Sequence, residues 1–523
     1  MSRADRLALL LSLLAILAGY LVSTRIFEGM AHLEDEMAYL WQAQAVAGGR
    51  LALPSPPEAK SFLVPFVIDY NGQRFGKYPL GWPVTLALGE RFGLRTLVNP
   101  LLAGLGIWLI YLLGKRLFGE TVALLSAGLA LISPFFLMNS GSLLSHPLGL
   151  VLSTALALAW VDNFTRPPRA PDASPEDSSS PVSALAPRWI VTLAGGGALG
   201  LLALSRPLTA VAVGLPFGLH GVYLLITGSW RVRRHVLALG LTAMAMAALH
   251  IVWQYAMTGD PFLNPYTLWW PYDKVGFGPG YGHIEGGHTL KQAWINTRFS
   301  LYTGRYDLFG WGGWSWIFIP FGLLAVLRDR NARALLPLSV LPSLVVVYLA
   351  YWIGSWLFGP RYYYEGLYSA TLASAAGIAL LAGWPTRPGK PFPNYRGWKR
   401  LRPLGMTVVL ALLAVTSVLF YTPARLNTMF GLYGVQRAHL KPFETPQAQE
   451  LAPALIIVHT RNGWIEYGRL LELQTPFLDT PFIFVISRGP KTDWRVSQYF
   501  PERQSYHYYP ADAPYTFYKD ARR

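Results

Sequence analysis

The sequence predicts an all-α, polytopic membrane protein that carries a small α/β domain at its C-terminal end. Hydrophobic residues make up 52% of the 523 residues and charged residues only 14%, whereas a soluble domain carries about 25% charged residues. The mean hydropathy is +0.31. Long apolar stretches recur as far as residue 421 and then stop. These observations exclude an ordinary cytosolic enzyme and a disordered protein.

The charge balance is strongly basic, with 44 Lys and Arg against 28 Asp and Glu and a net charge of +16. Such an excess suits either nucleic acid or a membrane surface. The apolar stretches decide for the lipid bilayer, so no nucleic-acid partner is expected. The chain has no cysteine, which excludes a disulfide framework, a thiolate zinc site and a cysteine nucleophile.

A membrane-spanning helix needs about 20 mostly apolar residues, and eleven stretches fit this description. The first is expected to be an uncleaved anchor, because it lacks a small-x-small cleavage site and further spans follow. The expected spans are roughly 7–24, 97–117, 121–139, 145–162, 189–205, 207–227, 235–257, 312–327, 333–353, 362–383 and 404–421.

Residues 79–93 form a twelfth apolar stretch, which is short and interrupted by Pro83, Glu90 and Arg91. If this stretch does not span, every cytoplasmic loop is basic and the short outer loops carry only Arg206 and Arg361, in agreement with the positive-inside rule. We therefore expect 79–93 to be an interfacial or half-inserted helix. The cytoplasmic basic residues are then Arg3, Arg6, Lys115, Arg116, Arg166, Arg169, Arg188, Arg231, Arg233, Arg234, Arg328, Arg330, Arg333, Arg387, Lys390, Arg396, Lys399, Arg400 and Arg402.

This topology gives a membrane domain over 1–421 with two sizeable outer segments. The first, 25–96, holds the expected interfacial helices, and the second is the large loop 258–311. The inner segment 165–188 is rich in Pro, Ser and Asp and is expected to be a disordered cytoplasmic linker.

The tail 422–523 contains no further span and is expected to form the extracytoplasmic α/β domain. Residues 454–459 and 481–487 are apolar runs of the length of buried strands, and 462–473 has the composition of a helix.

Three consecutive acids, Glu34, Asp35 and Glu36, follow the first span on the outer side. Acids at a helix start interact favourably with the helix dipole, so one interpretation is capping. The functional interpretation is a general base at the membrane surface. A neighbouring carboxylate would then tune the pKa of that base or hold a divalent metal ion.

Three cations are expected at the outer headgroup level. Lys77 precedes the interfacial helix and either extends its ammonium group to the surface or binds a lipid phosphate. Arg361 starts the tenth span and either pairs with Glu365 four residues later or binds phosphate. Arg206, beside Pro207 in a very short outer loop, poses the same question.

Histidines supply the remaining candidates. His146 lies between two spans at the outer face, where a lone histidine is usually structural. The loop 258–311 is rich in Gly, Trp and Tyr and contains His283, Glu285 and His288. These three residues form a candidate metal or acceptor site, although their spacing matches no strong metal motif.

Motifs of nucleotide-dependent and hydrolytic enzymes are absent: the sequence has no Walker loop, no dinucleotide fingerprint, no H-E-x-x-H and no G-x-S-x-G. A mechanism that uses a nucleotide in the cytosol therefore has no visible site.

Together these features resemble the GT-C glycosyltransferases, polytopic enzymes that take a sugar from a polyprenyl-phosphate carrier on the outer face. The likeness covers roughly residues 1–420. It is greatest to the branch of protein O-mannosyltransferases and lipid A aminoarabinose transferases. Its strongest local match is Asp35-Glu36-x-x-Tyr39 after the first span, followed by Lys77-x-Pro79-Leu80.

The resemblance implies roles for individual residues. Asp35 would be the catalytic carboxylate, with Glu36 orienting it or binding a divalent ion, and Lys77 and Arg361 would contact the carrier phosphate. Family members often have a second acid between the third and fourth spans, where this chain has His146. Either His146 takes that role or the role is not needed.

The implied function is an inverting transfer of a monosaccharide from a polyprenyl-phosphate carrier to a lipid, glycan or protein acceptor outside the cytoplasm. A transporter or flippase for a lipid-linked sugar is the main alternative. It would use the same phosphate ligands without a base, but it should have polar residues near the bilayer centre, and the expected spans have few. A surface polysaccharide polymerase or ligase would use the same donor chemistry with a larger donor.

Overall fold

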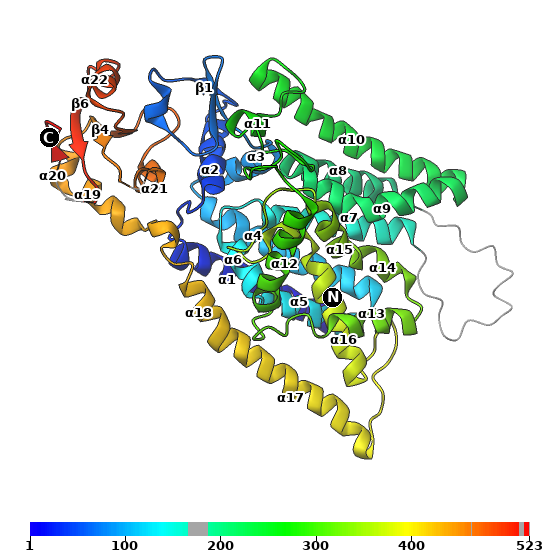
Figure 1. Ribbon diagram of the computed structural model, residues 1–523. Coiled ribbons are helices and arrows are strands. Elements are labelled where there is room, and N and C mark those ends of the chain that lie inside the picture. The colour runs from blue at the N-terminus through cyan, green and yellow to red at the C-terminus, as the bar shows by residue number, and fades with distance from the viewer. Residues whose placement is uncertain (166–186, 462, 512–516, 522–523) are drawn as a thin grey trace.

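The structure is a computed structural model that describes residues 1–165, 187–461, 463–511 and 517–521. It is mostly helical, with the strands of the C-terminal part gathered at one end (Figure 1). The linker expected at 165–188 falls largely outside the described residues.

Among the described residues, seven helical segments are long and apolar enough to cross a membrane, as a multi-pass membrane protein requires. They coincide with seven of the expected spans. They are α1 (Arg3–Leu21) with its π-helical extension η1 (Val22–Ile26), α4 (Arg95–Leu117), α7 (His146–Phe164), α9 (Pro207–Thr227), α10 (Trp230–Thr258), η4 (Arg361–Gly366) with α16 (Leu367–Ala382), and α17 (Leu401–Val415) with η6 (Thr416–Tyr421) and α18 (Thr422–Asn427).

The other four expected spans are bent or short. α5 (Glu120–Leu131) and α6 (Pro134–Gly141) meet at an angle of 60°, because Pro134 pushes Ser133 into extended backbone. α8 (Trp189–Ser205) has 17 residues. α13 (Ile319–Arg328) begins later than expected, and α14 (Ala332–Leu338) and α15 (Val340–Tyr348) together end earlier.

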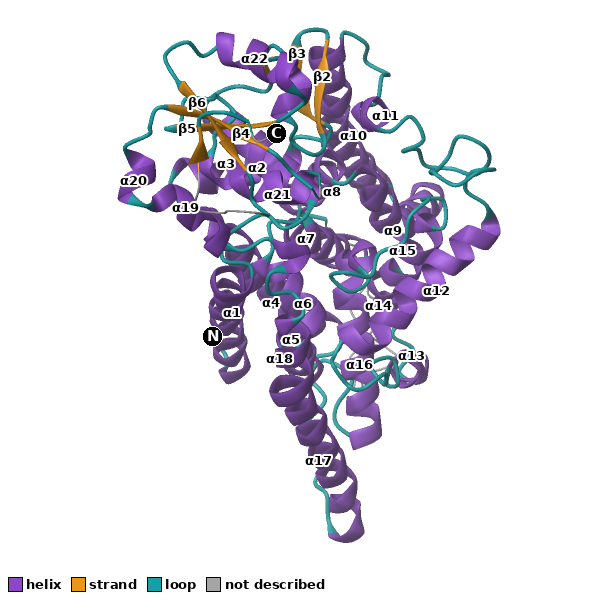
Figure 2. Cartoon of the chain, turned by 60° about the vertical axis from the view of Figure 1, so that its left-hand side comes forward, coloured by secondary structure: helices purple, strands orange, loops and turns teal. Residues whose placement is uncertain are grey.

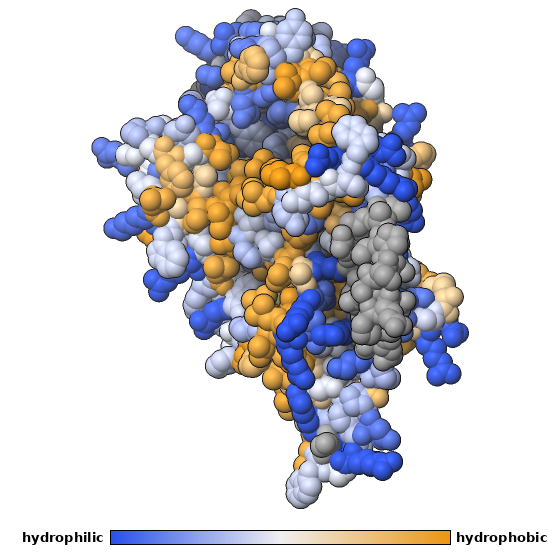
Figure 3. All heavy atoms as spheres, turned by 90° about the vertical axis from the view of Figure 1, so that its right-hand side faces the viewer, coloured by the Kyte–Doolittle hydropathy of each residue, from blue (hydrophilic) through white to orange (hydrophobic). Residues whose placement is uncertain are grey.

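The outer surface of these helices is apolar. On α1, the side chains of Leu10, Leu13 and Leu17 are more than half exposed, and Figure 3 shows apolar patches on another face of the molecule. Exposed apolar area of this extent is unusual for a soluble monomer and fits contact with lipid.

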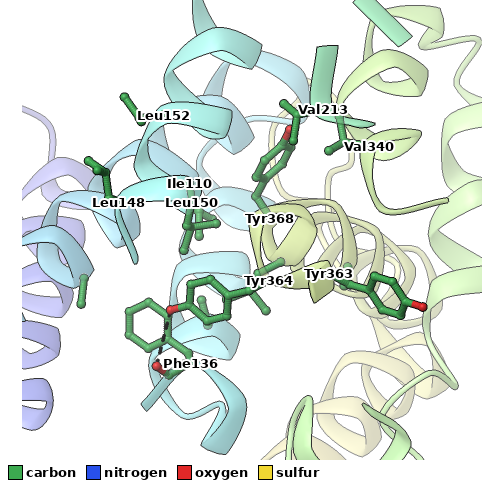
Figure 4. Close-up of a cluster of buried hydrophobic side chains, with 14 of the residues drawn as sticks. Ile110, Phe136, Leu148, Leu150, Leu152, Val213, Val340, Tyr363, Tyr364 and Tyr368 are labelled. Atoms are coloured by element: carbon green, nitrogen blue, oxygen red, sulfur yellow. Dashed lines mark hydrogen bonds between the residues drawn. The ribbon is translucent and has the colours of Figure 1, made fainter. Parts of the chain in front are cut away.

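Large buried side chains from many helices form the main core. Figure 4 shows part of this cluster, where Tyr364 of η4 and Tyr368 of α16 lie among side chains of α4, α6, α7, α9 and α15. Both tyrosines are fully buried. The close packing of η4, which begins with Arg361, fixes the position of that residue at the start of the segment that continues as α16.

Residues 25–96, where interfacial helices were predicted, contain two α-helices. α2 (Glu34–Ala47) follows the first span, and α3 (Gly81–Arg91) has 11 residues, which is too short to cross a bilayer. A small antiparallel sheet that was not predicted lies between them, in the order β1-β3-β2. It is formed by β1 (Leu53–Pro54), β2 (Val67–Tyr70) and β3 (Gln73–Gly76), and the short helix η2 (Ala59–Phe62) lies between β1 and β2 in the chain.

The second outer segment contains two helices, α11 (Pro265–Trp269) and α12 (Leu290–Asp307). The remaining short helices follow the tenth and eleventh spans. They are η5 (Gly397–Arg400), η7 (Leu432–Gly434), η8 (Arg437–Leu440), α19 (Lys441–Glu444) and α20 (Pro446–Gln449).

The C-terminal part forms a small α/β module around a four-stranded sheet in the order β5-β4-β6-β7. β4 (Ala454–Val458) pairs in parallel with β5 (Phe482–Ile486) and with β6 (Gln504–Tyr508), and β7 (Phe517–Tyr518) is antiparallel to β6. β4 and β5 match the predicted strands, and the predicted helix is divided into α21 (Trp464–Gly468) and the 3-10 helix η9 (Arg469–Leu473). β6 and β7 were not predicted.

Both faces of this sheet are covered. On one face, Ile456 and Phe484 pack with Tyr467 and Leu470. On the other, residues of β4 and β5 pack with Val496 of α22 (Pro490–Gln498).

The module rests on the first outer segment, as Figure 2 shows. Phe62 of η2 is part of its second core, and Glu472 forms an ion pair with Arg95 at the start of α4. The Arg488 guanidinium donates to the carbonyl of Lys60, with Nη2 at 2.9 Å. The tail therefore supports the segment from which α2 and β3 bring residues to the site described next.

Candidate active site

A cavity of about 310 Å³ lies where α2, the β3–α3 connection, the α8–α9 junction, the segment after α11 and the start of η4 meet. Five of the residues singled out from the sequence line it: Asp35, Lys77, His146, Arg206 and Arg361. They are separated by up to 326 positions in the chain. The fold therefore brings together residues that were predicted to share the outer face of the membrane.

Asp35 lies in the first turn of α2, which its neighbour Glu36 stabilises. The Glu36 carboxylate is buried and accepts hydrogen bonds from the backbone N–H groups of His32 at 2.8 Å, Leu33 at 3.0 Å and Leu143 at 2.7 Å. Its oxygens therefore hold the helix start and the α6–α7 connection. The expectation that Glu36 orients Asp35 or binds a divalent ion is not supported by these contacts.

The Asp35 carboxylate faces the cavity and has two close partners. The Tyr78 hydroxyl donates to Oδ1, and Arg361 Nη2 donates to Oδ2 at 3.2 Å. Burial acts to raise the pKa of Asp35, but Arg361, Tyr78 and Lys77 together hold that pKa below its ordinary value. Asp35 is therefore ionised near neutral pH and can accept a proton.

Lys77 follows β3 directly, and the strand fixes its position. Its Nζ lies 3.2 Å from Oδ2 of Asp273 and 3.6 Å from the centre of the Phe66 ring. Tyr351 Oη and Trp352 Nε1 each donate to Oδ1 of Asp273 at 3.0 Å. Burial lowers the pKa of Lys77, against the attraction of Asp273 and Asp35.

Arg206 is held by a second acid, Glu365. The Glu365 carboxylate is fully buried and its Oε1 lies 3.1 Å from Arg206 Nε. Arg206 also donates from Nη1 to Ser145 Oγ and from Nη2 to Tyr348 Oη, each at 3.2 Å. The alternative pairing of Glu365 with Arg361 is wrong.

His146 lies between these two groups. Its Nε2 is 3.4 Å from Arg206 Nη1 and its Nδ1 is 3.4 Å from Glu365 Oε1. Both ring nitrogens thus face members of the Arg206–Glu365 pair, so the imidazole serves to place Arg206. This geometry favours the second alternative, in which a second catalytic acid is not needed at His146.

Lys77, Arg206 and Arg361 are therefore each paired with a different acid, but the three pairs differ in their exposure to solvent. Lys77 and Asp273 are 3% and 1% exposed, and Glu365 is 0% exposed. Arg361 and Asp35 are 18% and 23% exposed. The Arg361–Asp35 pair is thus the one that an incoming anion reaches most easily.

The histidines of the large loop lie outside the cavity lining. The His283 ring packs edge-on against Trp352, with 5.3 Å between ring centres, and His288 Nε2 donates to the Leu349 carbonyl at 2.8 Å. Glu285 is exposed. Within the described residues no group of three His, Cys, Asp or Glu side chains could hold a metal ion, so the predicted metal site has no supporting geometry.

Sequence reasoning missed Asp273 and the aromatic lining of the cavity. Tyr266, Trp270 and Tyr362 all face it, beside Tyr39, which was noted from the sequence only as part of the motif after the first span. The abundance of aromatic residues in 258–311 was the available signal, but no motif marks Asp273.

No protein-family model matches the chain, and neither does any curated protein sequence. Solved structures do match. ArnT from Cupriavidus metallidurans bound to undecaprenyl phosphate aligns with a TM-score of 0.57 and 16% identity, covering 94% of this chain and 88% of ArnT. The apo form of ArnT aligns with the same TM-score and 17% identity, covering 96% and 89%.

The archaeal oligosaccharyltransferase AglB from Archaeoglobus fulgidus, in complex with an inhibitory peptide and a dolichol-phosphate, also matches. It aligns with a TM-score of 0.52 and 12% identity, covering 91% of this chain and 64% of AglB. At such identities the likeness concerns the fold, and it confirms the fold predicted from the sequence. The chain has the GT-C fold of membrane glycosyltransferases.

Proposed function

We propose that the protein is a membrane glycosyltransferase that moves a monosaccharide from a polyprenyl-phosphate carrier to a hydroxyl group outside the cytoplasm. One observation carries this proposal: the ionised Asp35 carboxylate faces Lys77, Arg206 and Arg361 in a single aromatic cavity. A base next to a cluster of cations suits a reaction that removes a proton and releases a phosphate. The undecaprenyl phosphate of ArnT and the dolichol-phosphate of AglB support this class of donor.

In the proposed reaction, the acceptor oxygen bonds to the anomeric carbon as the bond from that carbon to the phosphate oxygen breaks. Asp35 takes the hydroxyl proton, and the electron pair of the broken bond remains on the polyprenyl phosphate. A single displacement of this kind inverts the anomeric centre. Fixed cations in a site shielded from water stabilise the charge that develops on the leaving phosphate.

Arg361 has a particular place in this scheme, because its guanidinium group is bound to the base itself. A donor phosphate that draws Arg361 away from Asp35 removes the strongest neighbouring positive charge from that carboxylate. The pKa of Asp35 then rises, and the carboxylate becomes a stronger base. Donor binding would thus activate the base before the acceptor is deprotonated.

The size and lining of the cavity support a donor with one sugar. Ligand pockets commonly measure about 300–1,000 Å³, and this cavity, at about 310 Å³, is at the small end. Tyr266, Trp270 and Tyr362 provide flat apolar faces of the kind against which sugar rings pack. A polymerase or ligase with a long lipid-linked glycan would need more room.

The test is to reconstitute purified protein in liposomes with a panel of radiolabelled polyprenyl-phosphate monosaccharides. Transfer or hydrolysis of one member by the wild type, but not by Asp35→Asn, would support the proposal. Movement of an intact donor across the bilayer without bond cleavage, equally fast in both proteins, would contradict it and favour a transporter.

A further inference from the structure

A second, largely apolar cavity of about 660 Å³ lies between α12, α13, α14, α15 and α16. It shares no lining residue with the catalytic cavity. Its walls include Leu323 of α13, Val346 of α15 and Ala373 of α16. Leu323 and Val346 are 42% and 60% exposed, so the groove opens on the lipid-facing side of the helices.

Two arginines of α12, Arg298 and Arg305, border this groove, and none of the described residues that line it is acidic. They are seven residues apart, about two helical turns, and therefore lie on the same face of α12. Arg298 is exposed. Arg305 Nη2 donates to Tyr306 Oη at 2.9 Å, while its buried Nε has no hydrogen-bond acceptor among the described residues.

These two cations differ from the three cations of the candidate active site. Lys77, Arg206 and Arg361 each have an acid within 4 Å, whereas neither Arg298 nor Arg305 forms an ion pair within the described part of the chain. Arginine with an unmet donor beside an apolar groove is complementary to an amphiphile that combines an anionic head with a hydrocarbon chain.

We propose that this groove binds a membrane phospholipid with an anionic headgroup, its acyl chain lying between α13, α15 and α16 and its phosphate on Arg298 and Arg305. The charges favour this occupant over a zwitterionic lipid, because neither arginine pairs with an acid in the part of the chain that the structure describes. The outer segment 258–311 ends at α12 and supplies Tyr266, Trp270 and Asp273 to the catalytic cavity. A lipid bound between α12 and the neighbouring helices would therefore stabilise the position of that segment.

The test measures lipid retention by native mass spectrometry on delipidated, full-length protein. The probes are phosphatidylglycerol and phosphatidylcholine with identical palmitoyl-oleoyl chains. The variants are Arg298→Ala/Arg305→Ala and Val346→Trp, which fills the groove from its exposed side. Lys291→Ala, an exposed residue of the same helix outside the groove lining, is the matched control.

We expect the wild type and Lys291→Ala to retain phosphatidylglycerol about tenfold more tightly than phosphatidylcholine, within the usual range for charge-assisted contacts. The double arginine variant should lose that preference, and Val346→Trp should weaken retention of both lipids. An unchanged preference in the double variant would overturn the proposal.

Binding of undecaprenyl phosphate distinguishes a phospholipid site from a site for the polyprenyl tail of the donor. Val346→Trp should leave the dissociation constant of undecaprenyl phosphate unchanged, because the two cavities have separate linings. If Val346→Trp weakens the binding of undecaprenyl phosphate as much as the binding of phosphatidylglycerol, the groove binds the polyprenyl tail of the donor. The proposed phospholipid site is then wrong. These measurements involve no sugar transfer, so their outcome is independent of the proposed activity.

Discussion

The guanidinium group of Arg361 lies 3.2 Å from the carboxylate of Asp35, although 326 residues separate them. Arg361 starts the span that continues as α16, and Asp35 lies in the first turn of α2. The pair therefore joins the late part of the membrane domain to the first outer segment. It also combines the proposed base and a proposed phosphate ligand in one interaction, which leads to the first two predictions.

Asp35→Asn keeps the size of the side chain and removes the base. We expect transfer to fall about 100-fold or more. Undecaprenyl phosphate should bind at least as tightly as to the wild type, because Arg361 no longer has to leave a carboxylate. Steady-state transfer and lipid dissociation constants measure the two effects.

Glu34→Gln is the matched control, because Glu34 lies in the same helical turn and also lines the cavity. It should retain transfer within a few-fold of the wild type. If Asp35→Asn also retains its transfer rate within a few-fold of the wild type, Asp35 is not the base.

Arg361 and Lys77 should act together on one phosphate. Lysine cannot reproduce the planar fork of arginine, and a hydrogen bond to a charged group contributes about 1.5–3 kcal/mol. Arg361→Lys and Lys77→Ala should each weaken donor binding about tenfold to a hundredfold. Their double variant should lose less than the sum of the two losses in binding free energy, because both ligands share one anion.

The test is a double-mutant cycle, in which the donor dissociation constants of the wild type, the two single variants and the double variant are measured in one detergent. Lys115→Ala, which removes a lysine paired with Asp5 and predicted to face the cytoplasm, should have no effect. Small and strictly additive effects would mean that Lys77 and Arg361 do not meet on one phosphate.

The Lys77–Asp273 pair predicts a pH dependence. Burial lowers the pKa of Lys77, so its ammonium group is lost as pH rises through this lowered value, and donor affinity should decline there. Asp273→Asn removes an attraction that favours the charged form, so the decline should move to lower pH. Lys77→Arg should move it upward, because arginine stays charged.

Titrations of undecaprenyl phosphate binding from about pH 7 to about pH 10, below the ordinary lysine pKa of about 10.4, test these shifts. Coincident curves for the wild type and Asp273→Asn would show that Asp273 does not control the charge of Lys77.

Gly149 of α7 makes room for Glu365. A Cβ added there would lie 2.5 Å from Glu365 Oε1, so Gly149→Ala should displace the carboxylate that holds Arg206. We expect a loss of about 1–3 kcal/mol in stability and weaker donor binding. Gly106→Ala is the matched control, because its Cβ would meet Leu150 at an ordinary 3.5 Å. Equal behaviour of the two variants in thermal unfolding and donor binding would contradict this role for Glu365.

The sequence predicted the membrane architecture and five residues of the cavity, because apolar run length and loop charge depend on local composition. It did not predict which groups pair. One alternative was that Glu365 pairs with Arg361, because residues four apart lie on the same face of an α-helix. Residues 361–366 instead form a 3-10 helix. Such a helix has three residues per turn, so positions four apart do not face each other. Glu365 therefore turns to Arg206.

Asp273 and Glu36 show two further limits of sequence reasoning. Asp273 belongs to an irregular stretch with no motif, and its partnership with Lys77 spans 196 positions. Asp35 and Glu36 are adjacent acids, and composition does not distinguish them. On a helix their side chains diverge by about 100°, so one reaches the cavity while the other binds backbone N–H groups.

The side of the membrane on which the cavity opens is the last prediction. The positive charges of the loops predict that 384–403 faces the cytoplasm and that 422–523 lies outside. Because the chain has no cysteine, single thiols introduced at two exposed lysines report this directly. On intact cells, a membrane-impermeant maleimide should label Lys491→Cys in α22 and should not label Lys390→Cys until the membrane is permeabilised.

The wild type provides the background, since it has no thiol to label. Labelling of Lys390→Cys on intact cells would invert the topology. The C-terminal module rests on the segment that carries Asp35, so inversion would place the cavity on the cytoplasmic side. A donor sugar presented on the outer leaflet could not then reach Asp35, and the proposed reaction would have to be abandoned together with the topology.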